Sequence, residues 1–135
     1  MDIDPGSVLV TGANGALGKQ LFATLSGVEP GARRAAAVVR STSAAETLAG
    51  LPEAARPETH VVDYRDVDGL AKAMAGRSLV VHLVGILKES GRSRYEDAHE
   101  KASAAVAEAA QRSGVARIVY LSILGSAPDA RNACL

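Results

Sequence analysis

The sequence predicts an α/β fold in which a parallel sheet is covered by helices on both faces. Short apolar runs alternate with longer segments of helical spacing, and a glycine-rich stretch joins the first run to the first helical segment. Parallel strands that are buried on both faces read as continuous apolar runs, and their alternation with helices implies right-handed crossovers. We therefore expect a three-layer, doubly wound sheet of about five strands.

The strands are expected where short runs are apolar and rich in β-branched residues. These runs are residues 7–10, 35–40, 60–62, 79–83 and 116–121. Most of them lack the alternation of a half-exposed strand, so we expect them to be covered on both faces.

The helices are expected where apolar residues recur three or four positions apart. They are predicted around residues 17–25, 41–49, 67–74 and 98–109. Asp66 is a predicted N-cap, and Gly76 and Gly114 are predicted stop signals. Residues 50–57 are expected to form a loop, because prolines interrupt any regular element there.

Composition limits the function classes that need to be considered. A chain of 135 residues has room for one domain, spanning residues 1–135. Fifteen basic and fifteen acidic residues leave no net charge, which gives general nucleic-acid binding no electrostatic support. A single cysteine, Cys134, and three scattered histidines form no metal-binding spacing. An acidic start and the lack of a long apolar run favour a cytoplasmic protein.

The most informative stretch follows the first predicted strand and reads TGANGALG over residues 11–18. Gly12 suits a sharp turn, Gly15 lets the backbone approach a ligand, and Gly18 lets a helix pack closely on the sheet. Exposed N–H groups at the start of that helix favour an anion such as a dinucleotide pyrophosphate. The spacing is GxxGxxG and not GxGxxG. The candidate binding residues are Gly12, Asn14, Gly15, Ala16, Leu17 and Gly18.

This motif resembles the N-terminal motif of extended and atypical short-chain dehydrogenase/reductases. Residues 80–87 (VVHLVGIL), 122–125 (SILG) and 128–130 (PDA) are similar to the branch related to the nucleotide-binding accessory subunit of respiratory complex I, and more distantly to NmrA-like proteins. The resemblance covers nearly the whole chain. It implies a Rossmann domain that binds NADP or NAD.

Three further positions are candidates for holding the cofactor. Arg40 ends the second predicted strand with no carboxylate until Glu46, which favours NADP(H) over NAD(H), although Arg40 is equally compatible with a solvated charge at a strand end. The resemblance implies that Asp63, with Tyr64 beside it, hydrogen-bonds the adenine amino group; a turn carboxylate is the alternative. It also implies that Leu83, Val84 and Gly85 line the ribose and nicotinamide.

The catalytic residues of the resembled family are matched only in part. Ser122 corresponds to the serine that polarises a substrate carbonyl, but the tyrosine and lysine that should follow it are not present in the chain. The last strand and the substrate-binding part of the family also have no counterpart here. We therefore expect the N-terminal part of a longer reductase-like protein, whose small-molecule substrate is unknown.

Two other functions stay open at this point. One is a non-catalytic nucleotide-binding module, either a regulator or an assembly or accessory subunit of respiratory complex I. The other is a fragment of a sugar-nucleotide epimerase or dehydratase, since those enzymes share the N-terminal motif. Partners under these alternatives would be a respiratory complex or a second copy of the chain.

Overall fold

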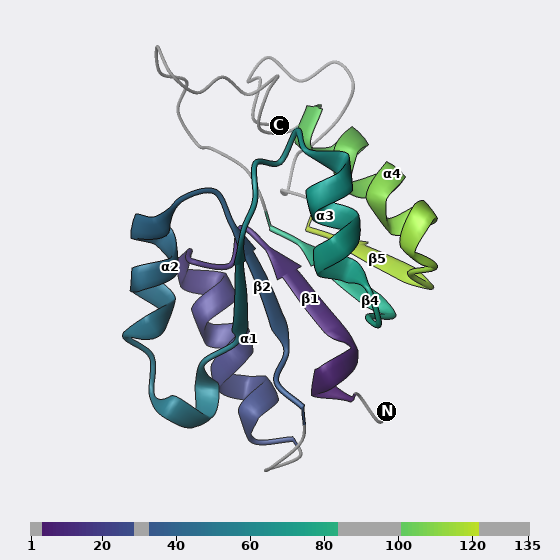
Figure 1. Cartoon of the computed structure of the whole chain (residues 1–135). Coiled ribbons are helices and arrows are strands. Elements are labelled where there is room, and N and C mark those ends of the chain that lie inside the picture. Colours follow the sequence, from purple (N-terminus) through teal and green to yellow (C-terminus); the bar gives the residue numbers. More distant parts are fainter. Residues whose placement is uncertain (1–3, 29–32, 84–100, 122–135) are drawn as a thin grey trace, which may run out of the picture.

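A computed structural model of the protein describes residues 4–28, 33–83 and 101–121, and these form one five-stranded parallel sheet with helices on both faces (Figure 1). The strands lie in the order β3-β2-β1-β4-β5. Their bounds are β1 Val8–Thr11, β2 Ala36–Val39, β3 Glu58–Val61, β4 Leu79–His82 and β5 Arg117–Tyr120. The strand order reverses between β1 and β4, which are neighbours in the sheet but far apart in the chain. The predicted doubly wound α/β fold is confirmed.

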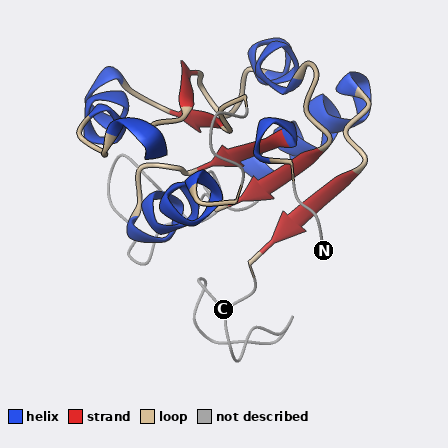
Figure 2. Ribbon diagram, turned by 90° about the horizontal axis from the view of Figure 1, so that it is seen from below, coloured by secondary structure: helices blue, strands red, loops and turns tan. Residues whose placement is uncertain are grey.

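Helices cover both faces of the sheet, and Figure 2 shows them on either side of the strands. Their bounds are α1 Ala16–Ser26, α2 Thr42–Ala49, α3 Val67–Met74 and α4 Ala102–Ser113, with short 3-10 turns η1 Pro5–Ser7 and η2 Glu53–Ala55. Helices α1 and α2 pack on one face, and α3 and α4 pack together on the other. This arrangement gives the three layers that the sequence predicts.

The helix ends follow the predicted capping chemistry. Asp66 accepts a hydrogen bond from the Gly69 N–H at the start of α3, and Ser41 accepts one from Ala44 at the start of α2. Gly114 ends α4 with a φ of 74°, and Gly76 follows α3 with a φ of 77°. Both glycines adopt the left-handed conformation that other residues rarely take.

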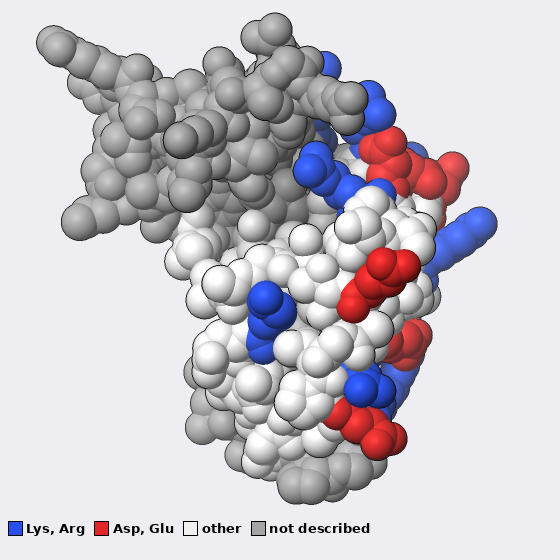
Figure 3. All heavy atoms as spheres, turned by 90° about the vertical axis from the view of Figure 1, so that its left-hand side faces the viewer, with Lys and Arg blue, Asp and Glu red and all other residues white. Residues whose placement is uncertain are grey.

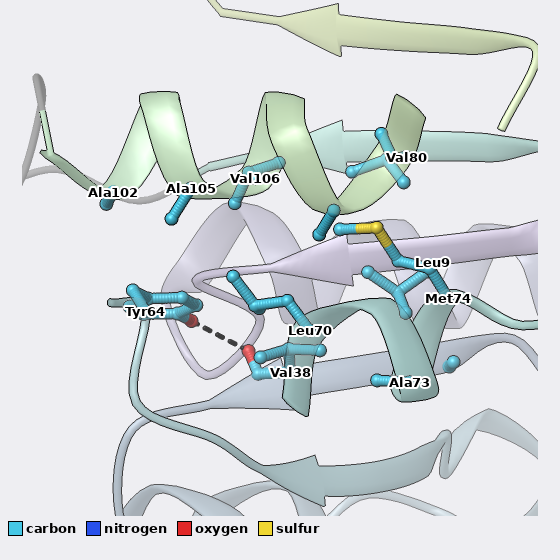
Figure 4. Packing of buried hydrophobic residues seen from close by; sticks show 13 residues of the cluster. Leu9, Val38, Tyr64, Leu70, Ala73, Met74, Val80, Ala102, Ala105 and Val106 are labelled. Carbon is cyan, nitrogen blue, oxygen red and sulfur yellow. Dashed lines mark hydrogen bonds between the residues drawn. The ribbon is translucent and has the colours of Figure 1, made fainter. Parts of the chain in front are cut away.

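The core on the side of α3 and α4 is built from small and medium side chains (Figure 4). Leu9 and Val80 come from adjacent strands, and Leu70 and Met74 come from α3. Alanines of α4 lie against them, so that this helix packs closely without aromatic side chains. Tyr64 lies at the end of the cluster, and its hydroxyl points to the backbone of β2.

Two of the three leucines that recur at intervals of four along α1 lie on its core side. Leu25 is buried and Leu21 packs partly buried against the core, together with the buried Gly18 and Phe22. Leu17 is 50% exposed, at the end of the helix nearest the glycine turn. The leucine spacing therefore predicts the helix but not the exposure of Leu17.

Two further differences concern the strands. Residues 50–57 hold the 3-10 turn η2, and β3 begins at Glu58, two residues before the predicted start. Burial on both faces is confirmed for β1 and β2 but not for the two edge strands β3 and β5. Val61 of β3 is 51% exposed, and Ile118, Val119 and Tyr120 of β5 are at least 40% exposed. β5 forms one edge of the described sheet, and α4 covers only one of its faces there.

Charges are interspersed on the surface. On the side of the molecule that Figure 3 shows, Lys and Arg side chains lie among Asp and Glu side chains. No helix among the described residues is long and apolar enough to cross a membrane, and no group of three potential metal ligands occurs among them.

A buried arginine that the sequence does not single out joins the amino ends of four strands. The Arg77 guanidinium donates hydrogen bonds to the carbonyls of Gly6, before β1, and Arg34, before β2, at 2.7 and 2.9 Å. It also pairs with Glu58, the first residue of β3, at 3.0 Å. Arg77 itself lies just before β4, and its side chain is 1% exposed. One side chain thus fixes the relative positions of these strands at the end of the sheet opposite the glycine turn.

We expect Arg77→Met to lower the free energy of unfolding by about 2 kcal/mol, because it leaves one buried and one partly buried carbonyl without their hydrogen-bond donor. Urea denaturation followed by circular dichroism measures the change. The control is Arg112→Met, which removes an exposed arginine from two surface ion pairs and should cost less than about 1 kcal/mol. Equal destabilisation by the two substitutions would contradict this role for Arg77.

Candidate functional site

The glycine turn lies at the carboxyl end of β1, beside the point where the strand order reverses. Gly12 follows β1 directly and has a φ of 64°, which suits glycine and strains other residues. Helix α1 then begins at Ala16 after the N-cap Gly15, which has no side chain to accept a hydrogen bond from the helix. The first N–H groups of a helix have no partner within the helix, so they are available to a ligand here.

The second and third glycines of the turn have different structural roles. A Cβ on Gly18 would lie 2.3 Å from the carbonyl oxygen of Ala13 and 2.8 Å from its Cα, both backbone atoms that cannot move aside. A Cβ on Gly15 would have its nearest described neighbour, the Gly12 carbonyl oxygen, at an ordinary 3.7 Å. Gly18 is therefore required by packing, whereas Gly15 keeps space open at the exposed start of α1.

The remaining candidates in the turn are also placed at this surface. Asn14, Ala16 and Leu17 are exposed, and Ala13 is buried beneath them. The structure thus brings together all six candidate residues of the turn at one end of the sheet. The backbone that they present is positive in character because of the unpaired N–H groups and the helix dipole.

The Tyr64 hydroxyl is hydrogen-bonded to the backbone of the glycine turn. The Gly12 N–H donates a hydrogen bond to the Tyr64 hydroxyl at 2.8 Å, and that hydroxyl donates to the Val38 carbonyl at 2.8 Å. The tyrosine therefore links the turn after β1 to β2 and is 6% exposed. The sequence analysis places Tyr64 beside Asp63 at the cofactor site, and the described contacts of its hydroxyl are both with the protein backbone.

The environment keeps this hydroxyl protonated. Burial raises the pKa of Tyr64 to about 12, and the hydrogen bond from Gly12 and the charge of Arg40 oppose this only in part. A neutral phenol can donate to Val38 while accepting from Gly12, which a phenolate could not do. The bridge between the two strands therefore depends on the proton.

Arg40 and Asp63 follow the carboxyl ends of two neighbouring strands, β2 and β3. The register pairs Val39 with Val61, and the Val62 N–H donates to the Val39 carbonyl at 2.9 Å, so the same register continued by one residue pairs Arg40 with Val62, the residue before Asp63. Both residues are exposed. They lie on the opposite side of the glycine turn from β4, where a dinucleotide bound across the sheet would place its adenosine.

Asp63 has a partner that the sequence analysis missed. Arg65 donates to it from its backbone N–H at 2.8 Å, from Nε at 3.2 Å and from Nη2 at 3.0 Å. These hydrogen bonds, more than the nearby charges of Arg65 and Arg40, hold the pKa of the Asp63 carboxyl below its usual value. The sequence does contain a signal for this contact. Arg65 follows Asp63 by two residues just after the predicted third strand, and an Asp side chain often accepts a hydrogen bond from the backbone two residues on in a turn.

A buried polar network lies beneath the other side of the turn. The Thr11 hydroxyl and His82 Nδ1 are 2.7 Å apart, and His82 Nε2 is 3.2 Å from the Ser103 hydroxyl of α4. The His82 ring also stacks on Tyr120 of β5, with ring centroids 5.7 Å apart. His82 is therefore a packed, hydrogen-bonded residue of β4. The contact residues Thr11, Ser103 and Tyr120 carry no signal that would have identified them.

The structure describes only part of the predicted nicotinamide side of the site. Leu83 follows β4, and its N–H donates to the Thr11 carbonyl at 3.1 Å, beside the glycine turn. Val84, Gly85 and the candidate catalytic residue Ser122 lie outside the described residues. Their predicted roles stay predictions.

Comparisons with known proteins agree on one family. A family model described as NAD(P)H-binding matches residues 12–134 of this chain. A search of curated protein sequences finds no match. Solved structures give many matches at the level of the fold.

Three similar structures are enzymes, two of them with a bound dinucleotide. A mutant uronate dehydrogenase from Agrobacterium tumefaciens, complexed with NAD, is 28% identical with a TM-score of 0.65, and the match covers 85% of this chain and 40% of that one. An NADPH-dependent quinone oxidoreductase from Escherichia coli, complexed with NADPH, is 27% identical with a TM-score of 0.67 and coverages of 87% and 37%. Triphenylmethane reductase from Citrobacter sp. is 28% identical with a TM-score of 0.71 and coverages of 94% and 41%. This chain thus spans about two fifths of the length of these proteins.

We expect Tyr64→Phe to lower the free energy of unfolding by about 2 kcal/mol at pH 8, because a buried N–H and a buried carbonyl lose their shared partner. The deficit should shrink as the pH rises above 10. Above pH 10, Tyr64 ionises in the unfolded state of the unaltered chain, whereas in the folded state its raised pKa keeps it neutral. The unaltered chain therefore loses stability as the pH rises from 10 to about 12.

Denaturation curves of both proteins between pH 8 and pH 11 measure this convergence. Tyr120→Phe is the control, since Tyr120 is 53% exposed. A stability deficit of Tyr64→Phe that stays constant up to pH 11 would refute the bridging role of the protonated hydroxyl.

Proposed function

This chain belongs to the NAD(P)H-binding family, and on that premise we propose that residues 12–18 hold the pyrophosphate of NAD(P)(H) at the start of α1. The observation that carries the proposal is the geometry of the turn at the carboxyl end of β1. Exposed backbone N–H groups and the positive end of the helix dipole face the position where a dinucleotide crosses the sheet. Gly15 leaves room there for phosphate oxygens to approach the backbone.

The adenosine half would then lie over β2 and β3. Asp63 is the proposed partner of the adenine amino group, and Arg40 is the proposed partner of a 2′-phosphate on the ribose. The exposure of both side chains at adjacent strand ends supports this assignment. We therefore propose that NADP(H) binds more tightly than NAD(H).

The nicotinamide half would lie on the β4 side, along Leu83, Val84 and Gly85. The bound nicotinamide would supply a hydride acceptor or donor, and Ser122 is the proposed group that polarises a substrate carbonyl. We propose that the whole protein is an NAD(P)-dependent oxidoreductase acting on a small molecule. The similarity to a dehydrogenase and to two reductases supports this reaction class.

A non-catalytic nucleotide-binding module is the second candidate. It requires binding of the dinucleotide at the same turn but no group that acts on a substrate. Oxidation of NADPH by the whole protein in the presence of quinone, aldehyde and sugar substrates separates the two functions. Turnover that disappears in Ser122→Ala supports the oxidoreductase, and tight binding without turnover of any carbonyl substrate supports the module.

Two glycine substitutions should separate binding from folding. We expect Gly15→Ala to leave the free energy of unfolding within about 0.5 kcal/mol, but to weaken NADPH roughly tenfold because the new methyl group occupies the approach of the phosphates. Gly18→Ala should instead destabilise the fold by about 2 kcal/mol or more, since its methyl group overlaps the Ala13 backbone.

Nicotinamide fluorescence titration measures the binding, and thermal denaturation measures the stability. Gly50→Ala is the matched control, because it places a methyl group in ordinary contact on the far end of α2. Unchanged NADPH affinity in Gly15→Ala would contradict the assignment of the pyrophosphate to this turn.

Arg40→Ala should weaken NADPH about tenfold and NADH less than twofold, because only NADPH carries the 2′-phosphate that the guanidinium would bind. Parallel titrations of both nucleotides measure the ratio of their dissociation constants. Equal weakening of the two nucleotides would remove the role proposed for Arg40, while leaving the pyrophosphate site intact.

A further inference from the structure

Arg65 lies at the proposed adenosine end of the site, yet no part of the proposed function uses it. It follows β3 closely and is bonded to Asp63 through its backbone and through its guanidinium. The pair is exposed, with side chains 73% and 55% accessible. Exposed ion pairs contribute about 0–1 kcal/mol to folding. The fold does not depend on this contact, so its effect on a ligand is the more informative question.

The charge balance at this edge depends on Arg65. Arg40 and Asp63 carry opposite charges at the ends of adjacent strands, and Arg65 adds a second positive charge beside Asp63. With Arg65 bonded to Asp63, the carboxylate is neutralised and the charge of Arg40 is left uncompensated among the three. A phosphate monoester carries about −1.5 to −2 charges at pH 7 and would be attracted to that edge.

The same carboxylate would have the opposite effect if its partner were removed. A free acid at the end of these strands is typical of sites that bind the ribose hydroxyls of NAD and that reject a 2′-phosphate through like-charge repulsion. Asp63 would become such an acid, one strand further from the turn. Arg65 is the bidentate partner of Asp63. It therefore determines whether a ribose phosphate meets a negatively charged carboxylate or a neutralised one.

We propose that Arg65 is a specificity-determining residue, which makes the site selective for an adenosine with a phosphate monoester on its ribose by neutralising Asp63. The inference rests on the proposed function, because it requires the adenosine to lie over β2 and β3. It goes further in assigning the selectivity to a pair of residues on the β3 side in addition to Arg40 on the β2 side. Arg65 acts here through Asp63 and not by direct contact with the phosphate.

The test is a double-mutant cycle on the ratio of NADH to NADPH dissociation constants. Arg65→Ala should lower this ratio about threefold to fivefold, the size expected when an exposed charge pair is broken beside a ligand charge. Adding Asp63→Asn should restore most of the ratio, because the uncompensated carboxylate is then gone. Any loss of the adenine contact in Asp63→Asn affects both nucleotides alike and cancels in the ratio.

Two matched measurements sharpen the result. Arg112→Ala removes another exposed arginine that is bonded to carboxylates, on α4, and should leave the ratio within about twofold. The loss in Arg65→Ala should also shrink when the ionic strength rises from about 0.05 to 0.5 M, since salt screens exposed charges.

The outcomes distinguish this inference from the proposed function. A ratio that is unchanged in Arg65→Ala, or one that Asp63→Asn fails to restore, would overturn the inference while NADPH and NADH still bind. Failure of the unaltered chain to bind either nucleotide would overturn the proposed function, and the inference with it.

Discussion

The contact of Gly18 with the backbone of Ala13 is the constraint on which the rest of the site depends. It brings α1 so close to the end of β1 that a single Cβ would not fit between them. Because only residues 12–15 separate β1 from α1, the first N–H groups of the helix lie at the carboxyl end of the sheet. The left-handed Gly12, the space at Gly15 and the exposed Leu17 all lie in or beside this short connection.

The buried polar groups of the molecule lie mainly at the two ends of the sheet. At the amino end, Arg77 joins four strands through two carbonyls and Glu58. At the carboxyl end, Tyr64 joins the glycine turn to β2, and His82 joins β1 to α4. The middle of the sheet is packed with alanine, valine and leucine side chains. Their contacts are non-directional, so they do not orient the strands and helices by themselves. The hydrogen-bonded ends therefore determine how precisely the binding surface is held.

Local sequence patterns predict much of this structure, because strands, helices and the glycine turn are local features. The apolar runs predict all five strands, and Asp66 and Gly114 predict helix ends that the structure confirms. The exposure of Leu17 and the close contact between Gly18 and Ala13 could not be predicted from the leucine spacing of α1. Arg77, the double hydrogen bond of Tyr64 and the pairing of Thr11 with His82 join residues more than 20 positions apart, which no local pattern reveals. Arg65 was missed for another reason: its importance comes from Asp63, to which the sequence assigns a different partner.

The central claim is that a pyrophosphate binds to the backbone at the start of α1. The most direct test is a heteronuclear NMR titration of the isotope-labelled chain with ADP-ribose, and with adenosine as a ligand that lacks the phosphates. The account predicts that the amide resonances of residues 15–18 shift strongly with ADP-ribose and little with adenosine. Amide shifts that leave residues 15–18 unaffected, or that are the same for both ligands, would contradict it.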